Sequence, residues 1–484
     1  MAEKSIKKNY IYNTIYQVLV MVIPLVTTPY LSRVLGADGN GQYSYSASIV
    51  SYFTLFAAMG TATYGQREIS YVRDDKKKLS SVFWNTEILS VCSTFICLIV
   101  YITFISLASL QNKIIYFIQA ISIISVATDI TWLFQGLEDF RKIVIRNTLF
   151  KLLGVSLIFL FVRSKNDLNL YVFQLVVINF LSMLSLWPFL KGIVHRPNWS
   201  EIHPFRQLPT VLSLFIPTIA ISIYTVMDKT MIGLITGSDF ENGYYEQATK
   251  LSRTALMVVT SLGTVMVPRI GYLFNKHDQD SVRHYMYRSY QFAWALGIPI
   301  CFGLIGISDN LVPWFYGPGY DKVSDLLKVL SFIIIAIGIN NVTGIQYLIP
   351  TKRQNIFTLT VVIGAITNFT FNSILIRTNA SVGAAIASVI AETTIAIVQI
   401  IIVRKELSLT VIIQRSWRYF LGGTVMLAFL RLENTLFSSS ILHTLIMIVS
   451  GVLVYMIMMI IERDDFLIGY AKQTIEKVTK RIKK

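Results

Sequence analysis

Residues 12–50 read YNTIYQVLVMVIPLVTTPYLSRVLGADGNGQYSYSASIV. They join two apolar runs, 11–32 and 43–64, through a short polar turn that contains Arg33. Each run is as long as the roughly 20 apolar residues that a helix needs to cross a bilayer. Runs of this length predict two consecutive transmembrane helices, because a helix satisfies its own backbone hydrogen bonds in lipid.

Twelve more apolar runs follow these two. They are 83–109, 114–137, 147–162, 170–191, 211–236, 245–267, 288–308, 327–349, 356–376, 381–403, 417–431 and 441–461. The 484 residues are 54% hydrophobic and only 14% charged, a composition more apolar than that of soluble globular chains. We therefore predict an all-α polytopic membrane protein with about fourteen transmembrane helices. A disulfide-rich secreted protein and a large soluble catalytic domain are excluded.

Lysine and arginine residues mark the expected topology. The chain holds 43 of them against 27 Asp and Glu, a net charge of +16. With the N-terminus in the cytoplasm, 31 basic residues fall in cytoplasmic segments and 7 in external ones. Because cytoplasmic loops of membrane proteins are enriched in Lys and Arg, this distribution predicts that both termini are cytoplasmic. It also explains the excess charge without nucleic-acid binding.

A weak internal repeat divides the chain into two halves. The stretch NGQY from Asn40 matches NGYY from Asn242, 202 residues later. The stretch QGL from Gln135 matches QYL from Gln346, 211 residues later. An even number of spans separates each pair, so the halves have the same topology. This predicts two pseudo-symmetric lobes around a central cavity, as in transporters built from parallel repeats.

The expected domains follow from this repeat. Residues 1–192 form the N-lobe with spans one to six, and 193–210 form a proline-containing cytoplasmic linker between the lobes. Residues 211–403 form the C-lobe with spans seven to twelve, and 404–461 add spans thirteen and fourteen. Residues 462–484 read as a basic amphipathic helix on the inner leaflet.

Basic residues inside the predicted spans are candidates for binding an anionic substrate, because an ionisable group in lipid needs a cavity or a partner. Lys250 and Arg253 lie on one helical stripe together with Glu246. The alternative is that Asp228 or Glu246 pairs with a neighbouring lysine and that these side chains stabilise helix contacts without binding substrate. Arg33 ends the first run, where it either faces a cavity or reaches the headgroups. The predicted cationic cavity consists of Arg33, Lys229, Lys250 and Arg253.

Acidic and amide side chains in the spans are candidates for coupling transport to Na⁺ or H⁺. Asp129, Asp228 and Glu392 lie in the fourth, seventh and twelfth runs, and Asn368 and Asn372 lie four residues apart in the eleventh. Carboxylate and amide oxygens are ligands suited to a hard cation or a relayed proton. Neutral, hydrogen-bonded side chains that hold helices together are the alternative.

Other chemistry finds no support in the sequence. The three cysteines form no CxxC pair, the histidines form no HExxH motif, and no GxxxxGK[ST] loop is present. The pairs Asp74-Asp75 and Asp464-Asp465 lie in basic segments and are interpreted as solvated charges. We therefore expect no catalytic residue, no metal site and no cofactor, and a protein that is not an enzyme.

Three stretches carry a family resemblance: residues 12–50, DITWLFQGLEDFRKIVIRN at 129–147 and MDKTMIGLITG at 227–237. They resemble the Wzx-type polysaccharide transporters of the multidrug/oligosaccharidyl-lipid/polysaccharide (MOP) exporter superfamily. The resemblance implies a flippase of the bacterial cytoplasmic membrane that moves undecaprenyl-pyrophosphate-linked oligosaccharides of capsule, exopolysaccharide or O-antigen type to the outer leaflet by alternating access. It implies membrane lipids, a polysaccharide polymerase and export machinery as partners, and a cationic cavity.

Three alternatives remain open at this point. A flippase for teichoic-acid precursors or lipid II would share almost every feature. A cation-coupled drug antiporter of the same superfamily would need carboxylates to dominate its cavity, whereas the spans around Lys250 are basic. A membrane glycosyltransferase or phosphosugar transferase would need an acidic metal site on an ordered loop.

Overall fold

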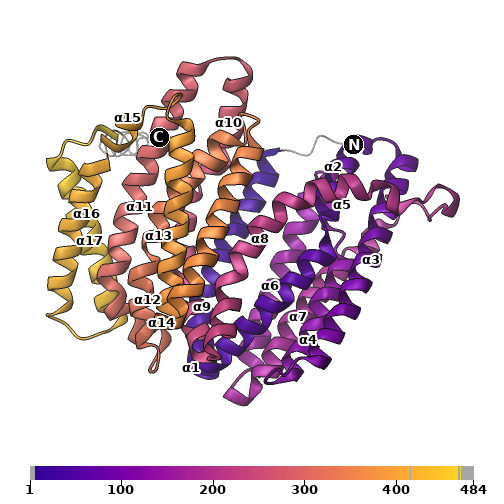
Figure 1. The fold of residues 1–484 in the computed structure, drawn as a ribbon, viewed down its shortest axis with the longest axis horizontal. Helices are drawn as coiled ribbons and strands as arrows, with labels where there is room; N and C mark the ends of the chain where they lie inside the picture. The colour runs from indigo at the N-terminus through magenta and orange to yellow at the C-terminus, as the bar shows by residue number, and fades with distance from the viewer. Residues whose placement is uncertain (1–5, 415, 467–468, 470–484) are drawn as a thin grey trace, which may run out of the picture. The chain divides into compact units, whose positions relative to one another are not determined.

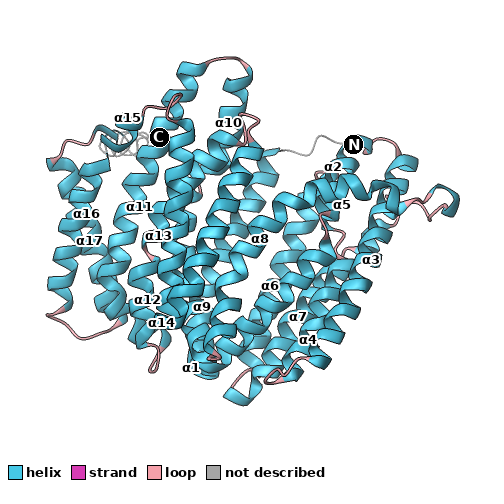
Figure 2. Cartoon of the chain, in the orientation of Figure 1, coloured by secondary structure: helices cyan, strands magenta, loops and turns pink. Residues whose placement is uncertain are grey.

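The structure, a computed structural model, describes residues 6–414, 416–466 and 469. Throughout these residues the regular elements are helices joined by short loops (Figures 1 and 2). This confirms the predicted all-α membrane fold. The amphipathic helix predicted at 462–484 lies mostly outside the described residues.

The helices in the first half of the chain have these bounds: α1 Ile6–Ala58, α2 Thr61–Val72, α3 Lys76–Leu107, α4 Lys113–Thr128, α5 Thr131–Gly136, α6 Phe140–Phe161, α7 Leu168–Leu184 and α8 Leu208–Thr236. Four short 3₁₀ helices lie between them: η1 Lys165–Asp167, η2 Trp187–Leu190, η3 Trp199–Glu201 and η4 Pro204–Gln207.

The second half of the chain continues with α9 Asp239–Thr260, α10 Gly263–Asn275, α11 Gln279–Tyr316, α12 Asp321–Leu330, α13 Phe332–Asn340, the π-helix η5 Asn341–Leu348, α14 Gln354–Val403, α15 Leu409–Gln414, α16 Ser416–Asn434 and α17 Ile441–Ile461.

All fourteen apolar runs lie on helical segments. Two long helices carry two runs each and are kinked between them, α1 at Gly36 with φ 74° and α14 at Ala380 with φ 49°. Glycine adopts such a positive φ without strain, whereas alanine does not. Among the described residues, nine helices are long and apolar enough to cross a membrane, or ten if one bent pair counts as one span. The count of fourteen therefore stays a prediction.

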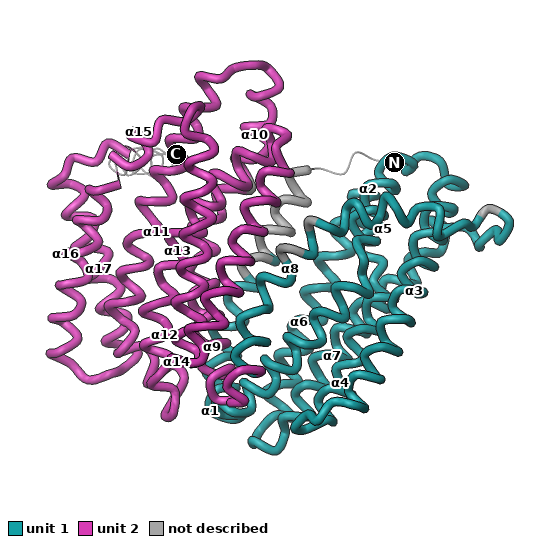
Figure 3. Tube along the Cα trace, viewed as in Figure 1, with its two compact units in different colours: residues 1–233 teal, residues 234–484 magenta. Residues whose placement is uncertain are grey.

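The chain forms two compact units, residues 1–233 and 234–484 (Figure 3). The division falls inside α8, because most of this helix packs with unit 1. Val211 belongs to an apolar cluster with Tyr64 and Leu89, and Thr230 Oγ1 donates a hydrogen bond of 2.9 Å to Ser48 Oγ. The linker predicted at 193–210 precedes this division by one helix, and the lobe limits given above stay a prediction.

Helix irregularities recur at the two offsets of the sequence repeat. Residues 59–60 interrupt the helical path between α1 and α2, and residues 261–262 do so between α9 and α10, 202 residues later. Asp129 ends α4 before the short α5, and Asn340, 211 residues later, ends α13 before the π-helix. Asp129 has extended backbone angles, whereas Asn340 keeps helical ones, so the second pair matches in position only. The matching positions support a repeat of structure as well as of sequence.

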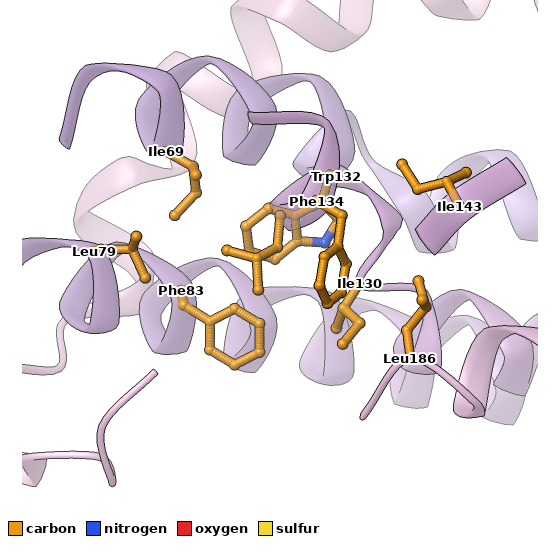
Figure 4. Close-up of a cluster of buried hydrophobic side chains, with 9 residues drawn as sticks. Ile69, Leu79, Phe83, Ile130, Trp132, Phe134, Ile143 and Leu186 are labelled. Atoms are coloured by element: carbon orange, nitrogen blue, oxygen red, sulfur yellow. The ribbon is translucent and has the colours of Figure 1, made fainter. Parts of the chain in front are cut away.

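An apolar cluster closes one end of unit 1. Figure 4 shows Trp132 and Phe134 of α5 in the middle of it, with Ile69 and Leu79 on one side and Ile143 on the other. The backbone of α2 lies directly against the Trp132 ring of α5, because a Cβ added at Gly65 would lie only 2.4 Å from that ring. Only glycine therefore lets α2 and α5 pack at this distance.

Candidate functional site

A small hydroxyl-rich cavity lies between the second half of α1 and α8 in unit 1. It has a volume of about 290 Å³, and its lining consists of Ser51, Tyr52, Thr54, Leu55, Ser222, Thr225 and Val226. Ser222 and Thr225 of the seventh run, 211–236, thus border a cavity. Asp228, one turn further, lies within electrostatic reach of the Tyr52 hydroxyl. Hydroxyl groups at this spacing can exchange hydrogen bonds with hydroxylated ligands or a hydrated cation.

The basic candidates of unit 1 make contacts of different kinds. Arg33 is exposed and its Nη1 donates a hydrogen bond of 2.9 Å to the Pro29 carbonyl one turn earlier. Pro29 lies inside α1. Lys229 is half-buried beside Asp228, and both side chains interact with neighbouring groups. Because Arg33 is exposed and Lys229 is only half-buried, water can hydrate both side chains.

Unit 1 also contains buried charges that the sequence argument passed over. Glu87 of α3 is only 3% exposed, and its Oε1 atom has no hydrogen-bond partner among the residues that the structure describes. Arg146 of α6 is 7% exposed, and its Nη1 donates to Thr131 Oγ1 at 3.2 Å. Asp129 lies within electrostatic reach of both Glu87 and Arg146. Asp129 Oδ1 also accepts the backbone N–H of Thr131 at 2.9 Å, which caps α5 after the helix break.

This set marks a functional candidate on physical grounds. Burial of an ionisable group without an ionic partner makes its charged form costly in a low-dielectric interior, and ionisable groups inside membrane spans mark candidate ion or substrate paths. Glu87 lies inside the apolar run 83–109, so the sequence held the signal. Arg146 directly precedes the run 147–162, so hydropathy alone counts it among the basic residues of the cytoplasmic segments.

The basic stripe of α9 lies in unit 2. Lys250 Nζ lies 3.3 Å from Glu246 Oε1, and this ion pair partly neutralises the lysine. Arg253, one turn further, is exposed, and within the described part of the chain it forms no ion pair. A guanidinium can bind anions by charge-assisted hydrogen bonds, so Arg253 stays a predicted anion-binding residue.

A chain of buried polar side chains connects both halves of α14 with α9. Asn372 Nδ2 donates to Asn368 Oδ1 at 3.0 Å, and Asn368 Nδ2 donates to Ser388 Oγ at 3.4 Å. The Ser388 hydroxyl lies 3.2 Å from the hydroxyl of Tyr245. Both asparagines are fully buried. The structure thus brings together the two amides that the sequence proposed as ion ligands, in a network that also holds helices together.

Glu392 lies on the second half of α14, next to the π-helix. Its Oε2 accepts a hydrogen bond of 2.6 Å from Asn340 Nδ2, at the residue where α13 passes into η5. A π-helical segment is rare and is frequent at functional sites. The described residues contain no group of three or more His, Cys, Asp or Glu side chains that could hold a metal ion.

The predicted site residues therefore fall into two groups. Arg33, Lys229, Asp228 and Asp129 belong to unit 1, and Lys250, Arg253, Asn368, Asn372 and Glu392 belong to unit 2. A bundle of long apolar helices that carries polar side chains at helix breaks defines a multi-pass membrane protein of transporter type.

Comparison with known proteins identifies the family. Residues 6–274 match the family described as "Polysaccharide biosynthesis protein", and the chain belongs to this family. A protein of Escherichia coli (strain K12) that carries the provisional name O-antigen transporter is 24% identical over 406 residues, which cover 83% of this chain and 97% of that protein.

Two solved structures share the fold. A structure of the lipid II flippase MurJ in an inward closed conformation superposes with a TM-score of 0.76 at 17% identity, over 93% of this chain and 98% of that one. An inward-facing MATE family multidrug resistance transporter of the MOP superfamily gives 0.59 at 13% identity, over 85% and 99% of the two chains. Together with the family match, they confirm the predicted resemblance to polysaccharide transporters of the MOP exporter superfamily.

Proposed function

We propose that the protein is a flippase that moves undecaprenyl-pyrophosphate-linked oligosaccharides from the inner to the outer leaflet of the bacterial cytoplasmic membrane. The oligosaccharide is a repeat unit of capsule, exopolysaccharide or O-antigen type. Membership of the polysaccharide biosynthesis family and the full-length likeness to a protein named as an O-antigen transporter support this proposal. The single observation that carries it is the exposed Arg253 on the basic stripe of α9, which forms no ion pair with any residue that the structure describes.

The residues account for the task that such a carrier faces. A pyrophosphate cannot cross hydrocarbon without its water and counterions, so basic side chains in a hydrated cavity must replace them. Arg253 supplies a free guanidinium, and Lys250 supplies a second cation whose charge Glu246 attenuates. A partly neutralised site binds the anion without retaining it. Arg33 and Lys229 are further basic groups proposed to contact the anion in unit 1.

We propose that transport is coupled to a cation, Na⁺ or H⁺. Asp228 beside the hydroxyl-rich cavity is the first candidate in unit 1, with Asp129 at the α4–α5 break as a second. The Asn368–Asn372 pair and Glu392 are the candidates in unit 2. We further propose that both termini are cytoplasmic, as the basic residues predict, and that a polysaccharide polymerase and export machinery act on the product in the outer leaflet.

A translocation assay in proteoliposomes tests the substrate assignment. Purified protein is reconstituted with a fluorescent polyprenyl-pyrophosphate oligosaccharide, and the fraction reaching the opposite leaflet is measured. We expect Arg253→Ala to lower the initial rate about tenfold, since one charge-assisted contact is worth about 1.5 kcal/mol or more. Arg404→Ala, an exposed arginine outside the predicted spans, serves as the control.

The panel of substrates separates the alternatives. Transport of lipid II or a teichoic-acid precursor in preference to the oligosaccharide would replace the proposed substrate by one of these. Full activity of Arg253→Ala together with Lys250→Ala would remove the cationic-site assignment. For coupling, we expect a sodium or proton gradient to accelerate wild type and not Asp228→Asn, and rates that ignore both gradients would remove the coupling proposal.

A further inference from the structure

The segment between α7 and α8 lies against the beginning of α3 in unit 1. Trp84 Nε1 donates a hydrogen bond of 2.8 Å to the His195 carbonyl, and the His195 N–H donates one of 2.9 Å to Ser80 Oγ. Further along the segment, the His203 N–H donates to Asn85 Oδ1 at 2.6 Å. Backbone groups of the segment are thus bound by side chains of α3, which defines its position.

A cavity remains at this junction. It has a volume of about 360 Å³, and its lining consists of Lys77, Ser80, Ser81, Trp84, His195, Arg196, Asn198 and Ile202. The size suits a group of phosphate dimensions with part of its substituent. Every lining side chain except Trp84 and Ile202 is polar or basic.

Two basic side chains line this cavity, and none of its lining residues is acidic. Lys77 comes from α3 and Arg196 from the α7–α8 segment, and both are exposed. In the described ranges neither takes part in an ion pair. The nearby Asp75 is otherwise engaged: its Oδ1 accepts the backbone N–H groups of Lys77 and Lys78, and its Oδ2 pairs with Lys78 Nζ at 3.6 Å.

The hydrogen bonds at the junction hold the α7–α8 segment beside α3, and Lys77 and Arg196 line the same cavity. An anion between two such cations is favoured by both charges. Ser81 adds a donor, because its Oγ accepts from Asn85 Nδ2 at 3.3 Å and its O–H remains to donate. A guanidinium, an ammonium and a hydroxyl around one cavity form a donor set for phosphate oxygens. A carboxylate ligand would use fewer of these donors.

We propose that this cavity is a binding site for a phosphate group, supplied by an anionic phospholipid headgroup or by free phosphate. The site is separate from the proposed transport residues and does not depend on the proposed function. A phosphate that bridges Lys77 and Arg196 stabilises the α7–α8 segment against α3. The Trp84 indole at the rim is suited to the headgroup region, where tryptophan is enriched.

Binding to the purified full-length protein tests the proposal. Inorganic phosphate is titrated calorimetrically at constant ionic strength, and retention of phosphatidylglycerol against phosphatidylcholine is measured by native mass spectrometry. The variant Lys77→Gln/Arg196→Gln removes both cations. We expect it to lose affinity for the bound species at least about tenfold, the effect of two charge-assisted contacts at a solvated site.

The matched control removes the same charge from the same two segments. Lys76→Gln/Lys191→Gln alters two exposed lysines that do not line the cavity. We expect this variant to bind within about twofold of wild type, because screened charges at a distance contribute little. A third variant, Trp84→Phe, keeps the ring and removes the hydrogen bond to His195, and we expect it to weaken binding while Lys77 and Arg196 are intact.

The possible outcomes distinguish a phospholipid headgroup from free phosphate and include two that would overturn the proposal. Phosphate binding that the cavity variant loses supports a free-phosphate site, and selective loss of phosphatidylglycerol retention supports a headgroup site. Wild type that binds neither species overturns the proposal. Equal losses in the cavity and control variants also overturn it, because they show a general effect of net charge.

Discussion

In unit 1 the buried Glu87 has an oxygen without a hydrogen-bond partner among the residues that the structure describes, and the buried Arg146 donates to neutral groups. In unit 2 the equally buried Glu246 pairs with Lys250, and Glu433 accepts a hydrogen bond of 2.7 Å from Ser450 Oγ. The buried Glu87 of unit 1 thus lies within electrostatic reach of a second acid, Asp129, whereas the buried Glu246 of unit 2 forms an ion pair with Lys250. Because an ionisable residue that is buried in a membrane span without an ion pair is usually functional, the difference marks Glu87 of unit 1 as a candidate functional residue.

The two units also differ in how closely their helices pack. Gly65 of α2 and Gly271 of α10 lie on helices that follow equivalent breaks of the repeat. A Cβ at Gly65 would meet the Trp132 ring at 2.4 Å, whereas at Gly271 the nearest atom would be 3.7 Å away, on Pro350. The buried Trp132 ring therefore fills the space beside Gly65, whereas the space beside Gly271 can hold a Cβ atom.

The largest effect is expected for Gly65→Val. The ring of Trp132 belongs to the apolar cluster of unit 1 and has no space to move, so the substitution should cost about 3 kcal/mol of the free energy of unfolding. Gly271→Ala should be neutral or stabilise by up to about 1 kcal/mol, because alanine is the better helix former. Thermal unfolding in detergent measures both. Similar midpoints for the two variants would remove the packing contrast.

A smaller loss is expected for Arg146→Met. The change roughly preserves volume but leaves Asn147 Oδ1 without the Arg146 donors and removes the electrostatic interaction of Arg146 with Asp129, which should cost about 2 kcal/mol. The comparison variant is Arg353→Met, which should cost about 1 kcal/mol because the arginine is 24% exposed and water can replace it.

Denaturation of the two arginine variants under the same conditions decides the comparison. The Arg353 pair is geometrically good, with Nη1 and Nη2 each 2.8 Å from a Glu406 oxygen. A greater loss for Arg353→Met than for Arg146→Met would show that ion-pair geometry outweighs burial here, and the contrast between the units would then be reversed.

A third pair of variants compares the buried carboxyls. Glu246→Gln releases Lys250 from its ion pair and should cost about 1 kcal/mol, because the lysine side chain is 35% exposed and can be rehydrated. Glu87→Gln should change the free energy of unfolding by less than about 0.5 kcal/mol, since no ion pair is lost. Unfolding midpoints measure both. A destabilisation by Glu87→Gln as large as that of Glu246→Gln would reveal a partner of Glu87.

The smallest effect concerns pH and the loop after α14. Burial alone would raise the pKa of Glu406, but hydrogen bonds from Arg353 and Tyr347 outweigh it, and the pKa lies below the ordinary value of 4.5. The carboxylate therefore adds stability that is present above that value and is lost as the pH falls through its lowered pKa. Because Glu406 is 44% exposed, the contribution should be about 0.5 kcal/mol.

Unfolding measured against pH tests this sign. The difference in stability between wild type and Glu406→Gln should shrink as the pH falls from about 6 to about 3. A difference that grows towards acid would mean that the neutral form of Glu406 is the stabilising one.

Much of the fold followed from hydropathy alone, whereas the candidate site did so only in part. The fifth run spans only 147–162, yet α6 has 22 residues, because polar residues at its start continue the helix. Asp129 was recognised as an intramembrane acid, but its contact with the following helix break was not visible in a sequence. Lys250 and Glu246 are four residues apart, so their pairing was an available alternative, which the structure adopts.

By itself, the sequence determined the membrane class, the order of the apolar helices and the repeat, because these depend on local length, hydropathy and charge distribution. The tertiary structure decided which charged groups are paired, buried or open. It separated Arg253 from Lys250, placed Glu87 beside Asp129, and brought Lys77 and Arg196 to one cavity. Most of these contacts join residues that are far apart in the chain. Their energies depend on burial and on distances in space, and local sequence patterns contain no information about either.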